Sequence, residues 1–134
     1  MYQAAAEIAA EIKPGQLITF EGPLGAGKTT FIQGLLKAWG YPQKVTSPTF
    51  SLVHEYQNLN FQNKTFDVAH FDLYRLKSSQ ELEDIGFRDY LDPNTVCLVE
   101  WPSKAGDYLP QSTFHLTLDY CNEGRVIASS NSAL

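Results

Sequence analysis

The segment that most constrains this chain reads Gly22-Pro23-Leu24-Gly25-Ala26-Gly27-Lys28-Thr29. It matches the pattern G-x-x-x-x-G-K-[ST], in which a glycine-rich loop joins a strand to a helix. In such a loop the backbone N–H groups surround the phosphates, the lysine lies beside the β and γ oxygens, and the Thr29 hydroxyl ligates Mg²⁺. The helix that follows presents its positive end to the same anion. The segment therefore predicts a nucleoside triphosphate site.

The residues on both sides supply the strand and the helix that such a loop requires. Residues 17–21 form a short apolar run of strand type. Downstream, apolar residues recur at helical spacing from Phe31 to Trp39, and Gly40 and Pro42 end that helix. A chance match of eight residues would lack both neighbours, so we interpret the segment as a phosphate loop.

Length and composition indicate a compact fold. The chain has 134 residues, so we expect a single P-loop domain over residues 1–134 with no linker. Hydrophobic residues make up 43% of the chain, which is ample for one core, and charged residues at 19% are too few for a disordered protein.

Charge and cysteine content limit the partners and the location of the chain. The formal charge is −5 and the pI is near 5.0, so tight direct binding to nucleic acid is not expected. Met1 to Ile12 lacks a basic leader and reads as an amphipathic surface helix, and no run is long enough to span a bilayer. Cys97 and Cys121 have no metal spacing and no evident reason to pair, so a cytoplasmic location is predicted.

Acidic residues gather in the third quarter of the chain. Such a run is usually a solvated helix face, and the alternative is a docking face for a basic protein partner. The residues concerned are Glu81, Glu83, Asp84, Asp89 and Asp92.

The middle of the chain predicts a hairpin and a short helix. Residues 50–56 alternate like a strand, Asn58 to Lys64 is a polar turn, and Thr65 to Asp72 is a second strand. The run Ser78-Ser79-Gln80-Glu81 has capping-box spacing for a helix that ends at Gly86.

The remaining strands complete the predicted sheet. Thr95 to Glu100 is a dense apolar run, typical of a strand buried on both faces, and we expect it beside the phosphate-loop strand. Thr113 to Tyr120 and Arg125 to Ser129 predict a closing hairpin. Together the elements predict a P-loop NTPase-like α/β fold of three layers, with a mainly parallel central sheet and a C-terminal β-hairpin.

Two carboxylates are candidates for the rest of the site. Asp72 and Glu100 each end an apolar strand, at the edge of the sheet where ligands of open α/β folds bind. One would hold Mg²⁺, directly or through water, and the other would orient the attacking water; which residue does which stays open. The segment Thr46 to Phe50 is equally a switch loop beside the γ-phosphate or a plain turn before a strand.

The histidines and a near-match to a guanine-binding element give no further site residues. His54, His70 and His115 lie in strand-like segments without ligand or triad spacing, so we interpret them as structural. The run Asn63 to Asp67 comes within one residue of the Asn-Lys-x-Asp element of GTP-binding proteins, but its register fails and it precedes a predicted strand instead of following one. We therefore expect ATP as the nucleotide.

Two motifs of this chain are far more specific than the phosphate loop, which many families share. They are His-Phe-Asp-Leu-Tyr-Arg-Leu at residues 70–76 and Val-Glu-Trp-Pro at residues 99–102. Together with residues 22–30, 47–50, 81–82 and 86–90, they resemble the TsaE family in order and spacing over nearly the entire chain.

The resemblance implies a small bacterial ATPase that supports formation of N6-threonylcarbamoyladenosine at position 37 of tRNAs reading codons that begin with A. It implies that the protein uses ATP and Mg²⁺, acts with the partners TsaD and TsaB, and meets tRNA indirectly through their complex. It also implies catalytic roles for Lys28, Asp72 and Glu100, and Thr29, Glu100 and Asp72 as the metal site. The residues implied to bind the nucleotide are Gly22, Leu24, Gly25, Ala26, Gly27, Lys28, Thr29, Thr30 and Trp101.

We expect the loop N–H groups, Lys28 and Mg²⁺ on Thr29 and Glu100 to draw charge toward the β and γ oxygens while Asp72 helps to position water. Hydrolysis by the protein alone should be slow, because no arginine has an obvious position at the phosphates. Two alternatives are an interaction module in which hydrolysis is incidental, and a small-molecule P-loop kinase suggested by residues 72–75. The kinase alternative would need an arginine-rich lid, which we do not find, and an acceptor domain, for which the chain has little length.

Overall fold

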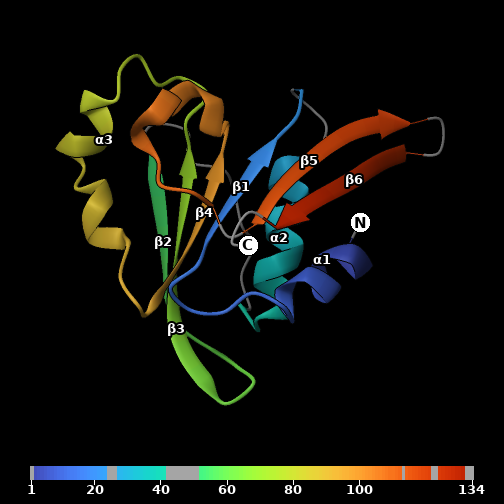
Figure 1. Ribbon diagram of the computed structural model, residues 1–134. Coiled ribbons are helices and arrows are strands. Elements are labelled where there is room, and N and C mark those ends of the chain that lie inside the picture. The colour runs from blue at the N-terminus through green and yellow to red at the C-terminus, as the bar shows by residue number, and fades with distance from the viewer. Residues whose placement is uncertain (1, 24–26, 42–51, 113, 122–123, 132–134) are drawn as a thin grey trace.

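Six strands pair into one sheet in the part of the chain that this computed structural model describes, residues 2–23, 27–41, 52–112, 114–121 and 124–131 (Figure 1). The elements in chain order are α1 Tyr2–Ala9, β1 Leu17–Glu21, α2 Lys28–Ala38, β2 Val53–Phe61, β3 Lys64–Asp72, α3 Gln80–Asp84, η1 Phe87–Tyr90, β4 Thr95–Glu100, η2 Pro102–Tyr108, β5 Phe114–Cys121 and β6 Gly124–Asn131. The strands lie in the order β2-β3-β4-β1-β5-β6.

The middle of the sheet is parallel and its two edges are antiparallel. β3, β4, β1 and β5 pair in parallel, and β2 and β6 each add an antiparallel strand through a hairpin. The dense apolar run of β4 lies directly beside β1, as its composition predicted. The mainly parallel sheet and the C-terminal β-hairpin are therefore confirmed.

Helices cover both faces of this sheet and make the three predicted layers (Figure 1). α1 and α2 pack on one face, while α3, η1 and η2 lie over the other. Because side chains alternate along a strand, Ile18 and Phe20 of β1 pack in the core under α2, and Leu17 packs in the opposite one. α2 is also tied to α1, since the indole N–H of Trp39 donates to the Ala9 carbonyl at 3.3 Å.

The β2–β3 hairpin differs from its prediction in the position of the turn. β2 continues to Phe61, so the polar segment predicted as a turn from residue 58 is mostly strand. Asn58 has a positive φ of 61° at a register shift between Tyr56 and Leu59, and this bulge accommodates the polar residues. The turn itself is Gln62-Asn63, whose φ angles of 53° and 63° suit a tight two-residue hairpin connection.

The short helix α3 forms half of the predicted capping box. The carboxylate of Glu81 accepts the backbone N–H groups of Lys77, at 2.6 Å, and Ser78, at 3.2 Å. The helix begins one residue later than the box predicts, so its N-cap residue is Ser79, which makes no side-chain cap hydrogen bond. The helix ends just before Gly86, which adopts the left-handed conformation at φ 72° and leads into η1.

Gly22 is required where β1 runs into the phosphate loop. Its φ is 150°, and a Cβ added there would overlap the backbone carbonyl oxygen of Leu118 in β5. We expect Gly22→Ala to lower the free energy of unfolding by about 3 kcal/mol, from overpacking against a rigid backbone added to φ strain. Gly40→Ala is the control, because Gly40 also has a positive φ, 87°, but its nearest atom would be 3.8 Å away.

Urea denaturation of the two variants and the wild type measures this difference. The Gly40→Ala change should cost about 1 kcal/mol, which is the backbone strain alone. Equal losses in both variants would contradict the steric explanation for Gly22.

Candidate functional site

On the face that packs against α2, the neighbouring strands β1, β3 and β4 are apolar, and β3 and β4 become polar toward their carboxyl ends. The apolar positions are Ile18, Phe20, Phe66, Val68, Val96 and Leu98, all buried. By strand alternation, the polar positions that follow on this face are His70 and Asp72 on β3 and Glu100 on β4. Because β3, β4 and β1 are parallel, these groups meet the glycine-rich segment after β1 at one edge of the sheet.

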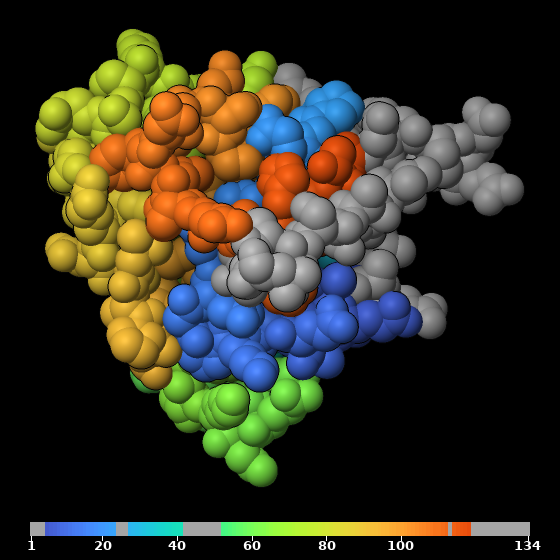
Figure 2. All heavy atoms as spheres, in the orientation of Figure 1, coloured from blue at the N-terminus to red at the C-terminus, as the bar shows by residue number. Residues whose placement is uncertain are grey.

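The chain segments that leave these strands also lie together. In Figure 2 the segments after β3, β4 and β1, coloured yellow-green, orange and blue, lie side by side at the top of the molecule. Backbone hydrogen bonds join them, from the Leu73 N–H to the Glu100 carbonyl at 3.1 Å and from the Trp101 N–H to the Phe20 carbonyl at 3.0 Å. The edge is therefore one connected surface.

Lys28 lies at the mouth of the phosphate loop, on the first residue of α2. Gly27 before it has a φ of 99°, which turns the chain into the helix. The Lys28 ammonium donates to the Gly22 carbonyl and, at 3.0 Å, to the Pro23 carbonyl. Burial holds the pKa of Lys28 below its ordinary value, and the nearby carboxylates of Glu100, Glu21 and Asp72 oppose that shift. The lysine is thus a largely desolvated charge aimed at the loop.

Thr29 and the two carboxylates predicted from the sequence lie at the same edge. The Thr29 hydroxyl donates to Glu100 Oε1 at 3.4 Å. Asp72 is the register partner of Glu100, one strand further from β1, and its Oδ1 accepts the Tyr74 N–H at 3.0 Å. Glu100 is 2% exposed, whereas Asp72 is only half-buried. The structure therefore brings Glu100 close to the loop threonine and leaves Asp72 nearer to solvent.

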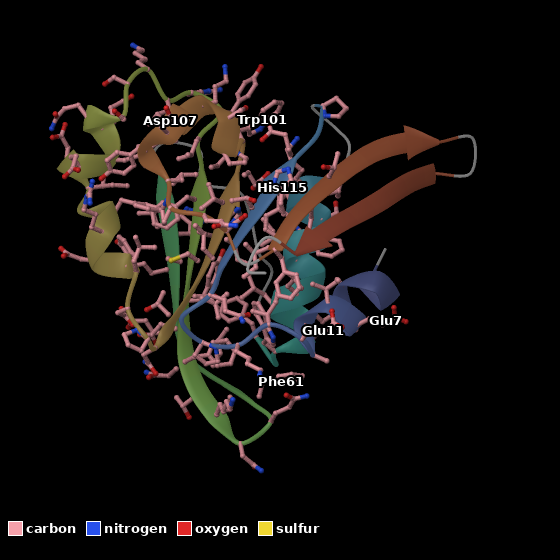
Figure 3. The ribbon with its side chains drawn as sticks, viewed as in Figure 1. Glu7, Glu11, Phe61, Trp101, Asp107 and His115 are labelled. Atoms are coloured by element: carbon pink, nitrogen blue, oxygen red, sulfur yellow. The ribbon has the colours of Figure 1, made fainter. Side chains whose placement is uncertain are left out.

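Trp101 forms an aromatic wall beside Lys28. The Lys28 ammonium lies 3.9 Å from the Trp101 ring centroid, a cation–π arrangement. Trp101 also packs on Tyr74 at 4.9 Å between centroids, and its backbone is left-handed, with a φ of 60°. A positive φ at a bulky residue is uncommon and is found most often at functional sites. Figure 3 shows Trp101 at the carboxyl end of the strands.

His70 lies at this edge too, although its sequence context predicted only a structural role. Its Nε2 lies 2.6 Å from Glu100 Oε2, and both side chains are buried. The available signal was its spacing, since His70 precedes Asp72 by two residues and so shares its strand face. His115, by contrast, bonds through Nδ1 to the Thr19 hydroxyl at 2.7 Å, and His54 lies on β2.

The donor atoms at this edge fit a magnesium ion together with phosphates. Mg²⁺ binds one or two carboxylates, a hydroxyl, phosphate oxygens and water. Thr29 and Glu100, with Asp72 beside them, are the oxygen donors of this kind at the edge. Among the described residues no group of three or more histidines, cysteines and acids is arranged to hold a metal ion.

Some predicted site residues cannot be compared with the structure. Leu24, Gly25, Ala26 and the candidate switch segment 46–50 lie outside the described residues. Thr30, which is described, lies half-buried in the first turn of α2.

No helix in the described ranges is long and apolar enough to cross a membrane.

A family model and two similar proteins carry the same family name. The profile of the family described as "Threonylcarbamoyl adenosine biosynthesis protein TsaE" matches residues 1–127. A Haemophilus influenzae protein named "tRNA threonylcarbamoyladenosine biosynthesis protein TsaE" is 41% identical over 118 residues, covering 86% of this chain and 72% of that protein. A Bacillus subtilis protein of the same name is 39% identical over 110 residues, covering 82% of this chain and 65% of that protein.

A solved structure agrees with the fold. The crystal structure of YdiB from Bacillus subtilis superposes with a TM-score of 0.74 at 30% identity, covering 98% of this chain and 79% of that one. The phosphate-loop architecture, the motifs on β3 and β4 and these matches lead to one conclusion: the chain belongs to the TsaE family.

Proposed function

We propose that this protein is a Mg²⁺-dependent ATPase that supports formation of N6-threonylcarbamoyladenosine at position 37 of tRNAs reading codons that begin with A. It acts in the cytoplasm with TsaD and TsaB and meets tRNA through their complex. The names of the relatives support the pathway, and the family membership supports the use of ATP. A net charge of −5 fits a protein that reaches tRNA through partners instead of binding it directly.

One observation carries the ATPase proposal: the Thr29 hydroxyl bonds to Glu100 at the end of the strand beside the phosphate-loop strand, while Lys28 lies at the loop mouth. In phosphate-loop NTPases an acid at this place, together with the loop Ser or Thr, holds Mg²⁺. When bound, that ion neutralises charge developing on the β and γ oxygens.

The residues of the chain then take distinct roles. Lys28 binds the β and γ oxygens, and Trp101 excludes water from one side of the ammonium. Thr29 and Glu100 would hold the metal, and Asp72, half-buried and one strand further away, would orient the attacking water. Turnover by the protein alone is slow, and an arginine supplied by a partner would raise it by about 10³- to 10⁵-fold.

The test of the pathway is cellular. When this protein is depleted, the threonylcarbamoyl adenosine content of bulk tRNA, measured by mass spectrometry of nucleosides, should fall, and expression of this chain should restore it. A normal content after depletion would refute the proposal. Phosphate release with and without TsaD and TsaB tests separately whether the partners stimulate hydrolysis. Equal, fast turnover in both conditions would contradict stimulation by the partners.

A further inference from the structure

We propose that His70 is a positioning residue that fixes the Glu100 carboxylate for Mg²⁺, an inference that rests on the proposed function. A glutamate has three rotatable side-chain bonds, and freezing them costs free energy that a bound ion must otherwise supply. Partners that orient a ligating carboxylate beforehand remove that cost from metal binding. His70 is such a partner on the strand next to Glu100.

The geometry divides the two oxygens of Glu100 between two partners. Oε2 lies 2.6 Å from His70 Nε2, and Oε1 lies 3.4 Å from the Thr29 hydroxyl. His70 pairs in register with Leu98, so it reaches diagonally along β4 to Glu100. Because one oxygen is held from β3, the other is directed toward α2 and the phosphate loop.

The other nitrogen of His70 indicates which tautomer makes this contact. Nδ1 is buried and has no hydrogen-bond partner among the described residues. A proton on Nδ1 would leave a buried donor unpaired, whereas an unprotonated Nδ1 leaves only an acceptor lone pair. The geometry is therefore that of the Nε2–H tautomer, which donates to Glu100.

The test is the Mg²⁺ dependence of nucleotide binding, measured by calorimetry with a non-hydrolysable ATP analogue. In His70→Leu the Mg²⁺ concentration for half-maximal enhancement of binding should rise about tenfold, the usual effect of losing an orienting partner. Binding in EDTA should stay unchanged. His70→Gln places an amide N–H near the position of Nε2 and should keep the requirement within about threefold of the wild type.

Val68→Ala is the matched control, because Val68 is buried on the same strand two residues before His70. It should lower the melting temperature without changing the Mg²⁺ requirement. A His70→Leu protein whose Mg²⁺ requirement matches the wild type would overturn the inference. If the wild type itself binds no nucleotide, the proposed function fails and this inference fails with it.

A measurement on the wild type covers the case in which His70→Leu does not fold. Long-range ¹H–¹⁵N spectra of the histidine rings distinguish the two neutral tautomers. The Nε2–H form at His70 supports the inference. The Nδ1–H form would overturn it, because Nε2 could not then donate to Glu100.

Discussion

Replacing Lys28 with alanine should lower ATP hydrolysis by about 10²- to 10³-fold, the effect of removing one preorganised charge from the transferring phosphate. Lys28 is 5% exposed, and its ammonium sits among the loop carbonyls and the Trp101 ring. A water molecule that took the place of the ammonium would bring no charge to the phosphates. Phosphate release measures the loss of hydrolysis, and calorimetry with a non-hydrolysable ATP analogue measures the loss of nucleotide binding.

The fold should tolerate this change. Burial lowers the pKa of Lys28, which means that the folded state pays a desolvation cost for the ammonium that alanine would not. The melting temperature of Lys28→Ala should therefore stay near that of the wild type. Lys37→Ala, at an exposed position in the last turn of the same helix, is the matched control and should hydrolyse ATP normally. A fully active Lys28→Ala protein would remove the basis of the proposed site.

Elements fixed by local chemistry were predictable from the sequence. The loop motif, the apolar runs of β1 and β4 and the closing hairpin each have a periodicity or composition that fits one structure. The neighbourhood of β4 and β1 followed because a strand that is apolar on both faces belongs in the middle of a sheet. The edge position of Asp72 and Glu100 followed from parallel pairing, and the structure places them opposite one another.

Features that depend on contacts between distant residues were not predictable. The polar residues after Tyr56 signal a turn by composition, yet pairing with β3 extends the strand through a bulge. His70 has no sequence neighbour that identifies its partner, because Glu100 is 30 residues away. The positive φ of Trp101, at the point where β4 ends and η2 begins, likewise carries no local sequence signal.

The two carboxylates should respond differently to loss of charge. Asp72→Asn should retain Mg²⁺-dependent binding of an ATP analogue and lower the rate constant of hydrolysis by about 10²- to 10⁴-fold, as for a group that directs a proton or water. Glu100→Gln should weaken the Mg²⁺ dependence of binding as well as hydrolysis, because Glu100 is the acid in contact with Thr29.

The loss of Mg²⁺ dependence in Glu100→Gln depends on which way the amide group faces. His70 donates to this side chain, so the carbonyl oxygen of glutamine would turn to His70 and its NH₂ group would face Thr29. The metal would then meet a donor where it requires an acceptor. If Asp72→Asn weakened the Mg²⁺ dependence and Glu100→Gln left it unchanged, the roles of the two carboxylates would be reversed. If both variants bind ATP and still support tRNA modification over many cycles, hydrolysis is incidental and the protein acts as a nucleotide-dependent interaction module.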